Sequence, residues 1–165
     1  MVMALTIRPG TLADLPAVVA LYEESGLDQG AAPALQEAEQ WFQTIQLYPN
    51  YKLWVAVDAL GDRIGQNSSQ AIEGAGVIVG TFSLLMVDNL VHHCSPAGVV
   101  EGVAVTPHLQ GQGIGRRMME FAIATCRAAG CYKLTLSTNL RRKAAHGFYE
   151  SLGFEKHGYS YRVEF

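Results

Sequence analysis

Three closely spaced glycines stand where a strand is expected to end and a helix to begin. The segment reads Gln110-Gly111-Gln112-Gly113-Ile114-Gly115. Glycines leave main-chain N–H groups uncovered, and in the first turn of a helix these groups and the helix dipole attract anions. Arg116 and Arg117 follow directly, although cations in a first helical turn are unfavourable unless an anion compensates them. The spacing therefore predicts a site for a phosphate-bearing ligand.

Two common phosphate-binding patterns do not fit this segment. A P-loop needs Gly-x-x-x-x-Gly-Lys-Ser/Thr, but counting from Gly111 places Arg116 at the second glycine, and no lysine follows. A dinucleotide fingerprint needs Gly-x-Gly-x-x-Gly with an acid about 20 residues later. Arg116 again occupies the last glycine position, and there is no acid near Thr135. The spacing thus disfavours an unrelated nucleotide-binding protein.

The strands that must position this loop are visible as runs of β-branched and aromatic residues between turn signals. They are expected over 4–8, 52–58, 76–87, 98–106 and 133–137, with a last strand or hairpin over 154–165 that turns at Gly158. The 98–106 strand runs directly into the glycine segment through Pro107.

Helices are indicated by apolar residues at three- and four-residue spacing. The first is capped by Thr11 or Asp14 and ends at Gly26. The others are expected from Leu35 to Ile45, over 113–129 and over 144–152. In the second helix, Trp41 and Phe42 fall on the apolar stripe. Both are expected to pack in the core, and the alternative is that they line a ligand site. Met118 and Met119 are expected to pack in the core.

The resulting order, β-α-α-β-β-β-α-β-α-β, combines hairpins with one strand-helix-strand crossover. This predicts an α/β (α+β) fold with a mixed, mostly antiparallel sheet and helices on both faces. A length of 165 residues predicts one domain over 1–165. A small-residue loop over 26–34 and a polar connection over 60–73 join the elements.

Composition narrows the function classes. Apolar residues make up 49% and charged residues 16%, which indicates a folded core. A net charge of −3 disfavours nucleic acid as a partner, and the absence of a long apolar run disfavours a membrane partner. Three cysteines and no secretory signal favour a reducing, cytoplasmic location.

The charge is unevenly distributed. Residues 1–106 carry 3 Lys and Arg against 11 Asp and Glu, while residues 107–165 carry 9 against 4. The basic part begins where the strand enters the glycine segment, which fits a polyanion bound there. The acidic part, including Glu23, Glu24 and Asp28, fits a cationic ligand on the other side.

The glycine segment resembles the Gln/Arg-x-x-Gly-x-Gly/Ala signature of the GNAT N-acetyltransferase superfamily, which grips the pyrophosphate of acetyl-CoA. Two flanking segments are similar to further elements of that family, in the same order and spacing: Val103-Ala104-Val105-Thr106-Pro107 and Phe148-Tyr149-Glu150-Ser151-Leu152-Gly153-Phe154. The resemblance covers essentially the whole chain. It departs at Arg142, where many members carry asparagine, and nearby Asn139 is a candidate substitute.

The resemblance implies transfer of acetyl from acetyl-CoA directly to an amine, without a metal. Tyr149 matches the family tyrosine that protonates the departing thiolate, and a phenol is neutral at pH 7. Glu101, the only acid of its strand, is the candidate base, because an unpaired buried carboxylate has a raised pKa. It is otherwise a solvent-facing or paired residue. A strand N–H at Val103 or Val105 is the expected oxyanion donor. The residues expected to contact acetyl-CoA are Val103, Ala104, Val105, Gln110, Gly111, Gln112, Gly113, Ile114, Gly115, Arg116, Asn139 and His146.

The remaining histidines, cysteines and basic residues with reactive side chains are expected to be structural or solvent-exposed before they are catalytic. His92, His93 and Cys94 are adjacent, so they point in alternating directions and make a poor zinc site. Cys126 and Cys131 lack a partner pattern for nucleophilic catalysis. The basic run Arg141-Arg142-Lys143 is either a solvated loop or a contact to a CoA phosphate or an acidic acceptor group.

Two functional hypotheses remain at this point. The first is an acetyl-CoA-dependent N-acetyltransferase acting on a primary amine of a small molecule or peptide, possible as a homodimer. The alternative is a non-catalytic acyl-CoA-binding sensor or interaction module on the same fold. The presence of both Tyr149 and Glu101 favours the enzyme. No motif in the first two helices names the acceptor.

Overall fold

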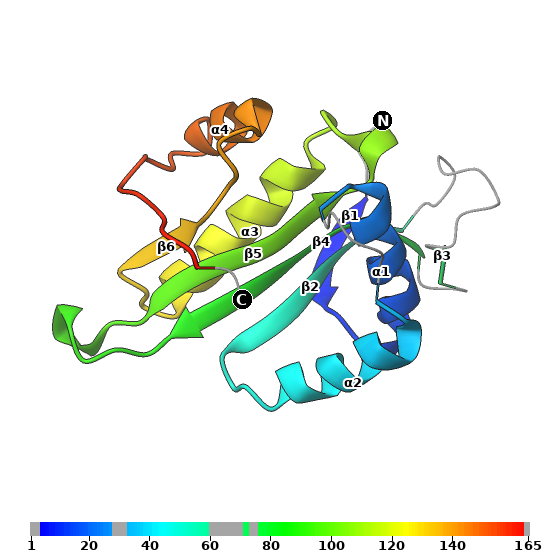
Figure 1. The fold of residues 1–165 in the computed structure, drawn as a ribbon, viewed down its shortest axis with the longest axis horizontal. Coiled ribbons are helices and arrows are strands. Elements are labelled where there is room, and N and C mark those ends of the chain that lie inside the picture. Colours follow the sequence, from blue (N-terminus) through cyan, green and yellow to red (C-terminus); the bar gives the residue numbers. More distant parts are fainter. Residues whose placement is uncertain (1–3, 28–32, 60–70, 73–75, 164–165) are drawn as a thin grey trace.

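One sheet organises the molecule, and helices cover both of its faces (Figure 1). The computed structural model describes residues 4–27, 33–59, 71–72 and 76–163. The strands are β1 (Leu5–Pro9), β2 (Tyr51–Asp58), β3 (Ala71–Ile72), β4 (Gly76–Val87), β5 (Ala97–Val105) and β6 (Lys133–Leu136). They lie in the order β1-β2-β4-β5-β6, with β3 paired to β4. Only the β5–β6 pair is parallel among these strands.

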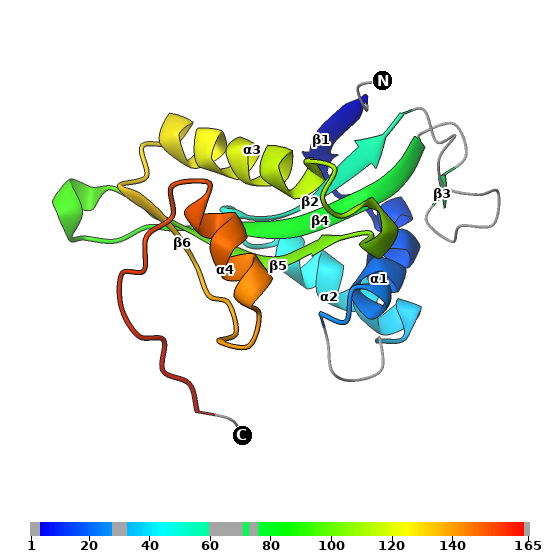
Figure 2. The same ribbon diagram turned by 90° about the horizontal axis from the view of Figure 1, so that it is seen from above.

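The helices divide between the two faces. They are α1 (Leu15–Glu24), α2 (Leu35–Gln46), α3 (Ile114–Ala128) and α4 (Lys143–Glu150), with short 3-10 turns η1 (Leu12–Asp14), η2 (His92–Cys94) and η3 (Pro107–Leu109). Seen from above, α1 and α2 lie on one side of the sheet and α3 on the other (Figure 2). The predicted mixed, mostly antiparallel sheet with helices on both faces is confirmed.

Each face of the sheet has its own apolar core. On one face Phe82 and Val100 of the sheet pack with Met118 of α3, and Met119 is equally buried. On the other face Val55 of the sheet packs with Leu21 of α1. Dense packing of this kind fixes the position of α3 against the sheet, and with it the glycine segment that precedes the helix.

The prediction for Trp41 is wrong. Its side chain is 61% exposed, whereas Phe42 beside it is buried. Successive helical residues point about 100° apart, and α2 meets the sheet through the Phe42 side of the helix. Trp41 therefore stands on the solvent side of α2.

The predicted last strand is also not formed. Residues 154–163 adopt no regular secondary structure, and Tyr159 and Tyr161 are 90% and 89% exposed. Alternating apolar residues favour a strand only when a neighbouring strand supplies hydrogen bonds. Residues 154–163 pair with no strand of the described sheet. The predicted connection over 60–73, apart from 71–72, and most of the loop over 26–34, including Asp28, lie outside the described residues.

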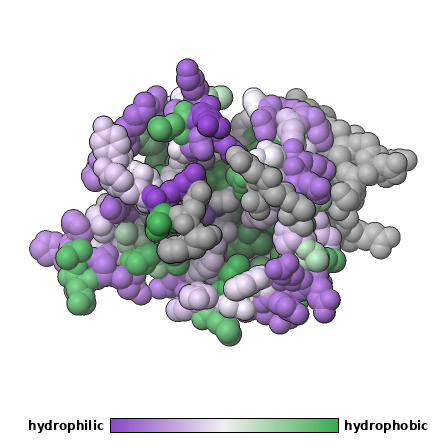
Figure 3. Space-filling model, viewed as in Figure 1, coloured by the Kyte–Doolittle hydropathy of each residue, from purple (hydrophilic) through white to green (hydrophobic). Residues whose placement is uncertain are grey.

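The β4–β5 connection is an exposed hairpin tip. His92, His93 and Cys94 have φ angles of 52°, 59° and 60°, in the left-handed region. The His92 ring stacks on Tyr132 with centroids 4.0 Å apart. Apolar surface is visible at this tip in Figure 3, and Leu90 of the tip is 93% exposed.

In the described part of the chain, no group of three or more His, Cys, Asp or Glu is placed to hold a metal ion. Nor does any described helix have the length and apolar content that crossing a bilayer requires.

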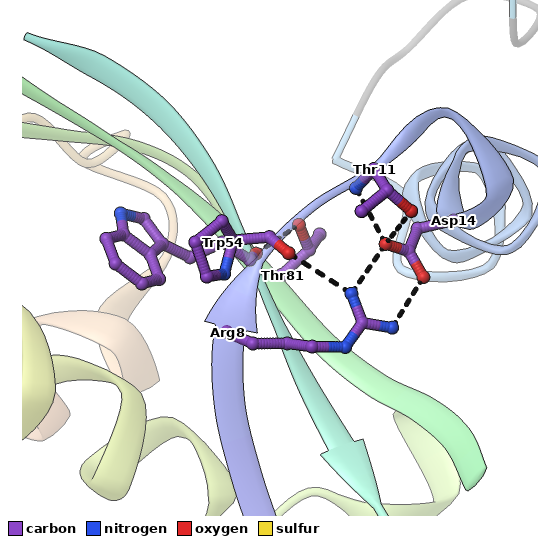
Figure 4. Close-up of polar contacts among 6 residues, drawn as sticks. Arg8, Thr11, Asp14, Trp54 and Thr81 are labelled. Carbon is purple, nitrogen blue, oxygen red and sulfur yellow. Dashed lines mark hydrogen bonds and ion pairs between the residues drawn. The ribbon is translucent and has the colours of Figure 1, made fainter. Parts of the chain in front are cut away.

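A buried ion pair fastens the end of β1 to the start of α1 (Figure 4). The Arg8 guanidinium donates to both carboxylate oxygens of Asp14, at 2.7 and 2.8 Å. The main-chain N–H and the hydroxyl of Thr11 donate to the same carboxylate, at 2.7 and 2.8 Å. Burial alone would raise the pKa of Asp14, but Arg8 and Thr11 together outweigh it and lower that pKa. Asp14 is therefore a structural cap.

Replacing Asp14 with asparagine should lower the free energy of unfolding by about 3 kcal/mol, because the change leaves the partly buried Arg8 charge without its partner. The stabilisation from a carboxylate of lowered pKa is complete above its unfolded value of about 3.9 and is lost as pH falls through the folded value. Urea unfolding at pH 7 and pH 3 measures both effects. The exposed Asp88→Asn variant is the matched control, and an equal small change in the two variants would contradict the prediction.

Candidate functional site

Strands β5 and β6 part midway along β5. Their pairing runs from Ala97 to Val100 on β5, but β5 continues to Val105. The β4–β5 register also shifts here, since Thr81 pairs with Ala104 and Ser83 with Glu101. Beyond Val100 one edge of β5 thus has no partner strand in the described chain. An open strand edge can pair with an extended ligand.

The main chain of Val105 faces this open edge. The Thr106 N–H donates to the Val79 carbonyl on β4, at 3.0 Å. Because backbone groups alternate in direction along a strand, those of the preceding residue point away from β4. In agreement, the Val105 carbonyl accepts a hydrogen bond from Gln110 Nε2 at 3.2 Å. The Val105 N–H therefore faces the open edge, and its role as oxyanion donor stays a prediction, while Val103 lies within the bulge.

The three positions after β5 require glycine for different structural reasons. Gly111 and Gly113 have φ angles of +78° and +86°, and a Cβ on either would meet no atom within 4 Å. They leave open space around bare main-chain groups at the start of α3. Gly115 instead allows close packing, since its Cβ would lie 3.3 Å from Phe148 Cζ. The site thus fits a phosphate-bearing ligand at Gly111 and Gly113.

The two arginines of the segment point in different directions. Arg116 donates to Ser151 Oγ at 3.0 Å and lies 3.9 Å from Glu120, so it remains between α3 and the end of α4. Arg117 donates to the Leu5 carbonyl of β1 at 2.8 Å. Arg116 can serve a phosphate at the helix start, whereas Arg117 has a structural contact.

Tyr149 lies on α4, next to Phe148, whose ring packs at Gly115 near the Val105 side chain. Its ring packs against Phe148 and Phe154, with centroids 5.0 and 5.8 Å away, and against the core shared with α3. Burial raises the pKa of Tyr149, and the nearby charge of Arg142 offsets only part of this rise. The phenol is therefore protonated at neutral pH and can donate a proton.

Asn139 and His146 lie close together in the structure, and their contacts stabilise the turn before α4. His146 Nε2 lies 3.0 Å from the Asn139 carbonyl. The Asn139 side chain accepts a hydrogen bond from the Arg141 N–H at 2.9 Å. These contacts give both side chains a structural role, and their contact with acetyl-CoA stays a prediction.

Glu101 stands on the opposite face of the sheet from Tyr149. It pairs with Ser83, which pairs with Leu53, and directly paired residues share a face. Leu53 belongs to the core under α1 and α2, so Glu101 points to their side. Its side chain is exposed, so the expected burial of this carboxylate is not present.

Tyr22 of α1 is a further residue that borders the β5 bulge, and no motif in the sequence includes it. Its hydroxyl would lie 3.3 Å from a Cβ placed on Gly102, where φ is +61°. The signal in the sequence was weak: a tyrosine at the margin of an apolar stripe has a ring to bury and a hydroxyl to expose. Tyr22 and Glu101 both border the α1 side of the bulge.

Cys126 is not placed to act as a nucleophile. Cys126 is buried in the core under α3, and burial, with a smaller effect of neighbouring Cys131, raises its pKa to about 12. Because the thiolate is the reactive form, Cys126 is unreactive at neutral pH.

Comparison with known proteins gives the family of this chain. Residues 29–154 match the sequence model of the acetyltransferase (GNAT) family. Over 81 residues the chain is 32% identical to a glucosamine 6-phosphate N-acetyltransferase of Arabidopsis thaliana and 37% identical to an aminoalkylphosphonate N-acetyltransferase of Salmonella typhimurium. Each match covers 49% of this chain and 52% of the relative, so the chain spans about half the length of these curated relatives.

A solved structure agrees over nearly the full length. It is a protein of Agrobacterium tumefaciens, provisionally assigned as an acetyltransferase, with 29% identity and a TM-score of 0.79. The match covers 96% of this chain and 99% of that protein. With the family match over most of its length, this chain belongs to the GNAT acetyltransferase family.

Proposed function

We propose that this protein transfers the acetyl group of acetyl-CoA to a primary amine of a small molecule or peptide. The observation that carries the proposal is the open edge of β5 with bare glycine N–H groups at one end, together with the protonated Tyr149 phenol on α4. The family and its curated relatives, which are named as N-acetyltransferases, support the same activity.

The residues have distinct tasks in this proposal. Acetyl-CoA supplies the acetyl group as a thioester. The Val105 N–H stabilises the oxyanion that forms when the amine nitrogen attacks the carbonyl carbon. As the C–N bond forms and the C–S bond breaks, Glu101 accepts the amine proton, directly or through water, and Tyr149 donates a proton to the sulfur. The products are an acetamide and the CoA thiol.

The two faces of the sheet suit the two substrates. Glu101 and Tyr22 lie on the α1 side, and Tyr149 packs with the α3 side. An amine that approaches from the α1 side therefore meets the base, while the sulfur leaves toward α4. The named acceptors of the two curated relatives, a glucosamine phosphate and an aminoalkylphosphonate, are small and carry both an amine and an anionic group.

The test is release of CoA thiol from acetyl-CoA with a panel of amines, including glucosamine 6-phosphate and aminoethylphosphonate. Amine-dependent release that is lost in Tyr149→Phe supports the enzyme. Binding of acetyl-CoA in calorimetry without release with any amine would instead support a non-catalytic acyl-CoA-binding module.

The remaining properties are proposed on the sequence. The chain is a single domain over 1–165 that works in the cytoplasm, without nucleic acid, membrane or metal as a partner. A homodimer is the oligomeric state that we propose for it. Light scattering of the purified chain tests the oligomeric state.

A further inference from the structure

The two ends of α4 touch different sides of the site. At its C-terminal end, Ser151 accepts a hydrogen bond from Arg116 at the start of α3, near the glycine segment. At its N-terminal end, the Arg142 guanidinium donates to the Gly26 carbonyl at 3.2 Å, just after α1. An eight-residue helix is about 12 Å long, so Arg142 is well separated from the first turn of α3.

Arg142 directly precedes α4 as its N-cap residue, with φ −85° and ψ 62°, so the helical repeat does not set the direction of its side chain. Its guanidinium instead reaches the Gly26 carbonyl after α1. The charge of Arg142 also reaches the phenol of the proposed general acid, because it lowers the pKa of Tyr149 against the larger effect of burial. The guanidinium thus lies next to the end of α1 and within electrostatic reach of Tyr149.

The charge of Arg142 is not balanced by an acid within the described chain. Arg8, Arg116 and Lys156 each have a carboxylate within 4.0 Å, but Arg142 contacts only a neutral carbonyl, and its side chain is exposed. A guanidinium carries five N–H donors in a planar fork that matches phosphate and carboxylate oxygens. Several of these donors remain for a ligand.

We propose that Arg142 binds an anionic group, a phosphate, phosphonate or carboxylate, on the amine acceptor. Its contact to Gly26 places it on the α1 side, where Glu101 and Tyr22 also lie, and away from the glycine segment. The inference deepens the proposed acetyl transfer and rests on it. It predicts an acceptor with an amine at Glu101 and an anionic group at Arg142.

The test compares acceptors that differ only in the anionic group, O-phosphoethanolamine and ethanolamine, in wild type, Arg142→Gln and the neighbouring control Arg141→Gln. In wild type, kcat/KM should favour the phosphorylated amine. In Arg142→Gln that preference should fall by about 10- to 100-fold, the loss expected when a charge-assisted hydrogen bond is removed. Arg141→Gln should keep the preference within about threefold.

Two further measurements separate the alternatives. If the loss in Arg142→Gln appears only in KM for acetyl-CoA, the guanidinium serves a CoA phosphate and the inference is overturned. Calorimetric titration of O-phosphoethanolamine into the CoA-bound protein tests binding without turnover. Weaker binding in Arg142→Gln than in Arg141→Gln supports the anion subsite even if no amine is acetylated, which would refute the proposed function alone. Equal binding in the two variants overturns the subsite.

Discussion

Phenylalanine in place of Tyr149 should lower kcat by about 10²- to 10⁴-fold, the usual contribution of a general acid. The substitution removes one hydroxyl and keeps the ring, which packs against Phe148 and Phe154. Folding and acetyl-CoA binding should therefore stay close to wild type. Steady-state thiol release gives kcat, and calorimetry with acetyl-CoA gives the binding constant.

The matched control for this change is Tyr132→Phe. Tyr132 also loses a phenol hydroxyl, but it lies next to β6 and stacks on His92. Its turnover should equal that of wild type. A Tyr149→Phe enzyme with unchanged turnover between pH 6 and 9 would show that Tyr149 is not the acid.

The pH profile of the wild type adds a second constraint on Tyr149. Its pKa is raised above the ordinary tyrosine value of about 10. A donor of raised pKa remains protonated until pH approaches that higher value, so Tyr149 should cause no fall in kcat below about pH 9. Any limb between pH 6 and 9 then belongs to the amine substrate.

Local patterns in the sequence were sufficient where one physical cause decides the structure. The apolar run over 76–87 forms β4 with the same bounds, because its side chains are buried on both faces of a central strand. The glycine segment was located at the start of α3 because the apolar stripe of the following helix begins at Ile114, directly after these glycines.

Contacts between distant residues could not be predicted in the same way. Arg117 and Arg116 are neighbours with the same charge, yet one binds the carbonyl of Leu5 and the other a hydroxyl on α4. The Arg142 contact to Gly26 joins residues 116 positions apart. Trp41 and Phe42 both suit an apolar stripe, and only the position of α2 on the sheet decides which is buried. Such choices depend on packing, which periodicity does not specify.

The role of Gly113 in the glycine segment can be tested against a matched control, Gly130, at the other end of α3. Gly113 and Gly130 flank α3, both have a positive φ (86° and 75°), and a Cβ on either meets no atom within 4 Å. Alanine at each position should therefore cost a similar 1–2 kcal/mol or so of backbone strain, about the penalty of a left-handed conformation. Thermal unfolding of Gly113→Ala and Gly130→Ala should show comparable losses of stability.

Only Gly113→Ala should weaken acetyl-CoA binding. A methyl group at Gly113 occupies the space in which phosphate oxygens must approach the main-chain N–H groups, whereas Gly130 lies at the other end of α3. Adding Gly111→Ala to Gly113→Ala fills the second open position. The acetyl-CoA dissociation constant of this double variant should rise by about 10- to 100-fold, because charge-assisted hydrogen bonds to the phosphates are lost. Equal affinity in Gly113→Ala and in Gly130→Ala would place the phosphates elsewhere, because one strained position is common to both and only the approach to the N–H groups differs.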